Sequence, residues 1–264
     1  MQNIENILDT LHLEDLNNEA HPSIFDDNEN YNMFIIRLPI IGENLDSKSF
    51  GFILTDQKSY YYDKEKKEFK EFDNEFTSVY KMVDKAVDRV LRSFTKFQDM
   101  VSDLEEDLYA NNTDKDFLNS WLEIKLQILR VERILARTTN IMDEFIGFYK
   151  DNEEFPINKY IDIHEHLDRI MRSALLQLSK LDYLYSFYNA KSNDKMNKMI
   201  EESQSIVDKK VLSKKWKEMF KMIVEDNPYL FLYIPNSITV INKNIKNVEN
   251  SPSGIWHNYI KWEK

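Results

Sequence analysis

Residues 76–108, FTSVYKMVDKAVDRVLRSFTKFQDMVSDLEEDL, decide the fold of this 264-residue chain. Their apolar side chains recur at alternating intervals of four and three positions, at Phe76, Tyr80, Val83, Val87, Val90, Phe94, Phe97, Val101, Leu104 and Leu108. This spacing is the heptad seam of an amphipathic helix about 33 residues long, or roughly 50 Å at 1.5 Å per residue. One long helix with a single buried stripe is therefore expected.

Two further helices are predicted beyond this one. A polar turn at 111–114 precedes a helix over about 115–150, and a second polar stretch precedes a helix over about 158–200. The last helix has its own apolar stripe, formed by Ile163, Leu167, Ile170, Ala174, Leu178, Leu181, Leu184 and Tyr188. Three long helices joined by short turns predict an extended antiparallel bundle, and the stripes are interpreted as packing surfaces.

The chain on either side of these helices has a different pattern. Residues 1–74 combine a short helical opening with strand-like pieces at 32–36, 50–55 and 59–62. The tail, 201–264, predicts a helix over 202–225 and strands at 229–234 and 237–241. We therefore expect an α+β, mostly helical fold with three parts: an α/β piece over 1–74, the helices over 75–200, and the tail.

Charge and composition exclude several function classes. The chain has 46 acidic and 35 basic residues, a net charge of −11, no cysteine and four glycines. These counts rule out disulfides and thiolate chemistry, and they argue against phosphate-cradling loops and nucleic-acid binding. All eight arginines lie at or before Arg172, and the tail carries ten lysines against eight acids. The first 200 residues therefore hold a charge of −13, which suits a surface that collects cations.

No motif predicts an enzyme. The chain has no GxSxG motif, and its carboxylates form no recognisable catalytic pair in the sequence. His164 and His166 suggest zinc, but helical residues two apart point about 200° away from each other, so both imidazoles cannot hold one ion. The acidic start and the absence of any run of roughly 20 apolar residues predict a soluble chain that is not exported.

Acids beside the helical seams allow two interpretations. Asp84 and Asp88 are four apart on the first long helix, and Asp162 opens the third. They either form a solvated helix face, with Asp162 compensating the helix dipole, or form a divalent-cation site between neighbouring subunits.

Several motifs follow one another in the N-terminal part of the chain: LEDL at 13–16, HP at 21–22, DNENY at 27–31, and the strand-like stretches MFIIRL at 33–38 and FILT at 52–55. Their order resembles that of the soluble domain of CorA-type magnesium/cobalt transporters. YIDIHEH at 160–166 is similar to the opening of that family's long stalk helix, so the resemblance covers about residues 7–200.

This resemblance implies the cytoplasmic, Mg²⁺-sensing domain of a pentameric transporter at the inner face of the inner membrane, with Co²⁺ as a further ion. It implies metal ligands at Asp15 and Asp162 across a subunit interface, with Glu14, Asp88 and Glu165 as additional positions. The family's pore-forming spans and Gly-Met-Asn signature are missing from this sequence. For the chain alone we expect no ion conduction, and weak association or a monomer.

The tail has a second resemblance, to the C-terminal end of family 5 extracellular solute-binding proteins, the peptide and nickel receptors of ABC importers. It rests on residues 202–208, Trp216, the stretch IVEDNPYLFLYIP at 223–235 and SPSGIW at 251–256. Two gene remnants joined near Ile200 would explain both resemblances. The alternatives are a fragment of a solute-binding protein and a purely helical oligomerisation module.

Overall fold

The computed structural model describes residues 4, 7–42, 44–56, 58–72, 76–110 and 117–225, with side chains as far as 221. The chain separates into two compact units, Met1–Asp208 and Lys209–Lys264. The strands expected at 229–234 and 237–241 lie outside the described residues.

The N-terminal part forms a five-stranded antiparallel sheet whose strands follow one another in chain order. The strands are β1 (Ile24–Asp27), β2 (Asn32–Ile41), β3 (Leu45–Leu54), β4 (Ser59–Asp63) and β5 (Glu68–Phe72). The three predicted strands are confirmed as β2, β3 and β4. β2 and β3 are longer than expected because residues 38–41 pair with residues 45–48, three of which are polar, in a tight hairpin.

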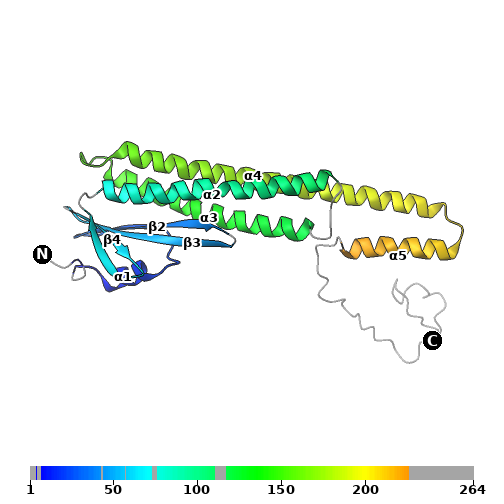
Figure 1. The fold of residues 1–264 in the computed structure, drawn as a ribbon, viewed down its shortest axis with the longest axis horizontal. Helices are drawn as coiled ribbons and strands as arrows, with labels where there is room; N and C mark the ends of the chain where they lie inside the picture. The colour runs from blue at the N-terminus through cyan, green and yellow to red at the C-terminus, as the bar shows by residue number, and fades with distance from the viewer. Residues whose placement is uncertain are drawn as a thin grey trace, which may run out of the picture. The chain divides into compact units, whose positions relative to one another are not determined.

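The two faces of the sheet bury different side chains, because successive residues of a strand point to opposite sides. Phe34, Ile36, Phe52 and Leu54 belong to the core shared with the long helices. The opposite face carries Met33, Ile35, Ile53 and Tyr62, which pack with Leu16 of the short helix α1 (Thr10–Asn17). The sheet therefore separates α1 from the helical bundle (Figure 1).

Three long helices form the bundle: α2 (Thr77–Tyr109), α3 (Phe117–Tyr149) and α4 (Ile157–Gln204). α2 and α3 pack on the inner face of the sheet, and α4 packs on these two helices. The three helices lie side by side in Figure 1, and the predicted mostly helical α+β fold is confirmed. α2 and α4 run in the same direction, because Tyr160 contacts Phe76 at one end and Lys191 contacts Leu108 at the other. α3 runs against both.

The predicted seam of α2 is buried from Val83 to Leu108. At its first turn the buried residue is Val79, and Tyr80 is only half-buried. Tyr80 instead makes an edge-on contact with the ring of Tyr160, with centroids 6.1 Å apart.

A single helix over 202–225 is not formed. α4 ends at Gln204, and α5 (Lys209–Glu225) begins after a break at 205–208. The Ser205 hydroxyl donates to the Glu202 carbonyl at 2.8 Å, in competition with the helical hydrogen-bond pattern. None of the helices that the structure describes has the length and hydropathy needed to cross a bilayer.

Candidate metal centre

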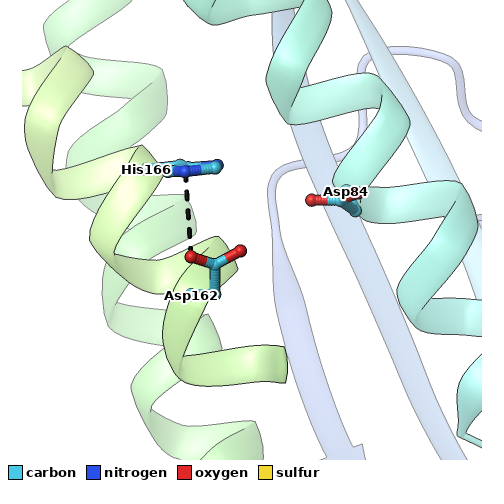
Figure 2. A group of neighbouring side chains, drawn as sticks. All are labelled: Asp84, Asp162 and His166. Atoms are coloured by element: carbon cyan, nitrogen blue, oxygen red, sulfur yellow. Dashed lines mark ion pairs between the residues drawn. The ribbon is translucent and has the colours of Figure 1, made fainter. Parts of the chain in front are cut away.

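Two carboxylates and one imidazole meet between α2 and α4. Asp84 points from α2 toward α4, while Asp162 and His166 extend from consecutive turns of α4 (Figure 2). One ligand atom from each of the three residues lies within 4.8 Å of the other two. Within the described part of the chain, this is the one group of three or more histidine and acidic residues close enough to hold a metal ion.

The heptad pattern explains how these side chains come together. Asp84 directly follows the buried Val83, so it lies at the edge of the α2 seam. Asp162 and His166 are four apart and therefore share one edge of α4. The register between the helices is set nearby, where the Tyr160 hydroxyl donates to the Phe76 carbonyl at 2.8 Å.

His166 lies between two carboxylates at more than hydrogen-bond distance. Its Nε2 is 3.8 Å from Asp162 Oδ1, and its Nδ1 is 3.7 Å from Asp88 Oδ1. Nδ1 is buried and has no hydrogen-bond partner among the described residues. The ring thus places one nitrogen toward each acid without closing a hydrogen bond to either.

The local potential at the cluster is negative. Burial raises the pKa of the Asp84 carboxyl, the charge of Asp88 raises it further, and Asp162 adds to the same effect. His166 acts in the opposite direction. Burial and the two neighbouring carboxylates thus disfavour the ionised form of Asp84, and a cation bound there would be stabilising.

The structure brings together only some of the predicted ligands. Asp162 belongs to the cluster and Asp88 lies beside it, 3.7 Å from His166 Nδ1, whereas Glu165 is exposed on α4 outside it. Asp15 lies on α1, across the sheet from the bundle, with its Oδ1 3.2 Å from His21 Nε2. Glu14 is exposed on the same helix.

The two histidines of the HEH motif face different helices, as their spacing predicts. His164 Nε2 lies 2.9 Å from Asp143 Oδ1 of α3, while His166 lies against Asp88 of α2. What the sequence reasoning missed is that His166 joins the acids of the other helix. Its signal was available in the four-residue spacing of Asp162 and His166, which matches that of Asp84 and Asp88.

Comparisons with known proteins agree with this fold. A family model described as CorA-like Mg²⁺ transporter protein matches residues 2–201. The complete CorA magnesium transporter structure from Methanocaldococcus jannaschii superposes with a TM-score of 0.60 at 14% identity, covering 88% of this chain and 76% of that one. The full-length CmaX protein superposes with a TM-score of 0.55 at 14% identity, covering 73% of this chain and 64% of that one.

A curated protein matches a shorter stretch. The oligopeptide-binding protein AppA of Bacillus subtilis is 33% identical over 70 residues, which is 26% of this chain. The match spans 13% of the length of AppA.

Proposed function

Because the chain belongs to the CorA-like Mg²⁺ transporter family, we propose that residues 1–200 are the Mg²⁺-sensing cytoplasmic domain of such a transporter. In this proposal the domain lies at the inner face of the inner membrane and binds Mg²⁺ as a regulatory ion, with Co²⁺ as a further ion. The proposal assigns no catalysis to the domain.

The observation that carries the proposal is the gathering of Asp84, Asp88 and Asp162 between α2 and α4. Burial and the charges of Asp88 and Asp162 raise the pKa of Asp84. Repulsion between Asp84 on α2 and Asp162 on α4 opposes the close approach of the two helices. A hydrated Mg²⁺ ion prefers oxygen ligands and neutralises this repulsion. Occupancy of the cluster therefore favours one position of α4 relative to α2, which is how a cation shifts a conformational equilibrium.

A second carboxylate pair is proposed between subunits. Asp15 and Asp162 lie on opposite sides of the sheet in one chain, so they can share an ion only when two copies meet. Glu14 beside Asp15, and Glu165 beside Asp162, would extend this pair. We propose a homo-oligomer in which Mg²⁺ joins α1 of one subunit to α4 of the next.

The test is thermal melting of the full chain with and without millimolar Mg²⁺. An ion at 100 times its dissociation constant adds about 2.7 kcal/mol to the free energy of unfolding. We expect Mg²⁺ to raise the melting temperature of the parent, and to have little effect on the double variant Asp15→Asn and Asp162→Asn. Asp103→Asn, an exposed position on α2, is the matched control and keeps the response. A flat parent response would refute the proposal.

Sedimentation separates this function from a helical oligomerisation module. The module predicts self-association that is indifferent to Mg²⁺. The sensing domain predicts association that Mg²⁺ strengthens and that Asp15→Asn weakens.

The match to AppA favours a second candidate, a fragment of a solute-binding protein. We propose that the residues after about 200 supply this match, and that they were joined to the transporter-like part near Ile200. Titration of the full chain with short peptides tests for binding, with saturable binding expected only if the fragment retains its function. One uninterrupted DNA read across codons 190–215 tests the join, since separate reading frames there would indicate an assembly artefact.

A further inference from the structure

We propose that Asp84, Asp162 and His166 of one chain form a site for a first-row transition ion such as Zn²⁺ or Ni²⁺, with Asp88 supporting His166. The inference rests on the proposed cation-sensing role of this cluster and names the ion that the cluster prefers. It differs from the proposed pair between subunits because all four residues come from a single chain.

The imidazole sets the preference. Mg²⁺ takes oxygen ligands and keeps several waters, whereas imidazole nitrogen is a common ligand of zinc, nickel and copper. Mg²⁺ can be held by the carboxylates alone, so the histidine points to an ion that also takes nitrogen ligands. Two carboxylate oxygens and one imidazole nitrogen match the three-ligand zinc sites that leave a fourth position to water.

The distances are close to those that such an ion requires. With bonds of 2.0–2.2 Å, ligand atoms around a tetrahedral ion lie about 3.4 Å apart. The three donor atoms already lie within 4.8 Å of one another. Asp162 is exposed and Asp84 is only partly buried, so their carboxylates can rotate inward without repacking the core.

The second carboxylate at His166 is independent support. A histidine that ligates a metal through one nitrogen usually donates its other N–H to a carboxylate or carbonyl. Here Nε2 faces Asp162, and the buried Nδ1 faces Asp88 at 3.7 Å with no hydrogen-bond partner among the described residues. A metal on Nε2 would fix the tautomer with the proton on Nδ1, and a small ring movement would bring that proton to Asp88.

An ion at this site would fasten α4 to α2 within each subunit. Existing links between these helices at this end include the bond from Tyr160 to Phe76, the contact of Tyr80 with Tyr160, and Lys159 over the ring of Tyr80. Metal bonds from both helices to one ion would add a link about one turn further along, and they would do so in a monomer.

Isothermal titration of Zn²⁺ into the metal-stripped full chain tests the inference. We expect the tightest site to hold one Zn²⁺ per chain, and His166→Gln to weaken it at least tenfold. Asp88→Asn should weaken it about tenfold or more, the usual effect of removing an outer-shell partner. His164→Gln is the matched control, because His164 lies two residues away and pairs with Asp143 of α3.

The outcomes separate this inference from the proposed function. Loss of the Zn²⁺ site in His166→Gln, with the Mg²⁺ response retained, supports the inference. Equal Zn²⁺ affinity in His166→Gln and His164→Gln overturns it, as does a parent that responds to Mg²⁺ alone, although Mg²⁺ sensing then stands. Failure of both ions to bind overturns both proposals. If His166→Gln does not fold, Asp84→Asn takes its place, with the same loss expected.

Discussion

The Tyr160 hydroxyl donates a hydrogen bond of 2.8 Å to the carbonyl oxygen of Phe76, and both side chains are fully buried. This contact joins the first turn of α4 to the residue that precedes α2, 84 positions earlier in the chain. It therefore sets the register in which Asp162 and His166 meet Asp84.

Replacing Tyr160 by Phe removes this bond while keeping the ring. The Phe76 carbonyl keeps a second donor, the Tyr80 N–H at 2.9 Å, so no buried acceptor is left unpaired. We expect a loss of about 1 kcal/mol in the free energy of unfolding, measured by urea titration. Tyr183→Phe, at a site 54% exposed, should change stability far less. Equal effects of the two substitutions would argue against a structural role for the bond.

Two adjacent threonines of α3 should respond in opposite ways to replacement by Val. Thr138 Oγ1 donates to the Arg37 carbonyl at 2.7 Å and lies 2.8 Å from Ser23 Oγ, which accepts from the Arg37 N–H. Thr138→Val leaves buried groups unpaired and should cost about 1–3 kcal/mol.

Thr139 is the control for that experiment. Its hydroxyl is buried with no hydrogen-bond partner among the described residues, so Thr139→Val should be neutral or stabilising. Chemical denaturation of both variants gives the comparison. A loss in Thr139→Val as large as that in Thr138→Val would contradict it.

Replacing either of two glycines by Ala should change the free energy of unfolding, but in opposite directions. A Cβ at Gly51 of β3 would overlap Leu16 Cδ2, and Leu16 is the fully buried residue of α1. Gly51→Ala should therefore cost about 1–3 kcal/mol through overpacking. A Cβ at Gly147, exposed on α3, meets no atom within 4 Å. Gly147→Ala should stabilise by about 0.5 kcal/mol, because Ala restricts the unfolded chain and favours the helix. Melting temperatures of the two variants that shift in the same direction would refute this prediction.

Lys64 predicts a pH dependence. Burial lowers the pKa of its ammonium group to about 8, from an ordinary value of 10.5, even though it donates to the Asn18 carbonyl and Ser49 Oγ at 2.6 Å. Between these two values the unfolded chain holds a proton that the folded chain has released, so stability rises with pH there. Relative to Lys64→Met, the parent should gain melting temperature between pH 8 and 10.

Lys70 should make stability change with pH in the opposite direction, and it serves as the control. Its hydrogen bond to Asp63 raises its pKa, so its contribution is present at neutral pH and is lost as the pH rises through the folded value. The difference between the parent and Lys70→Met should therefore shrink at high pH. A parent whose advantage over Lys64→Met stays constant from pH 7 to 10 would contradict the assignment for Lys64.

The helices could be predicted from sequence because their signal is long and periodic. The seam from Val83 to Leu108 leaves only one helical face to bury, and the structure buries that face. β1 and β5 escaped prediction because they are four and five residues long, and β5 (EFKEF) breaks the alternation of a strand with two consecutive charged residues, Lys70 and Glu71. The sequence has no proline or glycine, the usual helix breakers, at the break after Gln204.

The acidic residues of the candidate site could be predicted from the sequence, but its histidine could not. Asp88 and Asp162 were identified from their place beside the seams, and Asp84 from its four-residue spacing to Asp88. Periodicity along one helix fixes which edge a side chain occupies, but it does not say which neighbouring helix lies there. His166 was therefore considered only with His164 of its own helix, while its contacts are with Asp162 and with Asp88 of α2.

α4 has 48 residues, which makes it a rod of about 72 Å. Its apolar contacts with the bundle are concentrated between Tyr160 and Leu184, so the candidate site lies near the held end. A rigid rod converts a rotation into a displacement that grows with distance. Each degree of tilt at Tyr160 moves Gln204 by about 1 Å, given a rise of 1.5 Å per residue. A movement of ångström scale around one ion would therefore produce a displacement several times larger at the far end of α4.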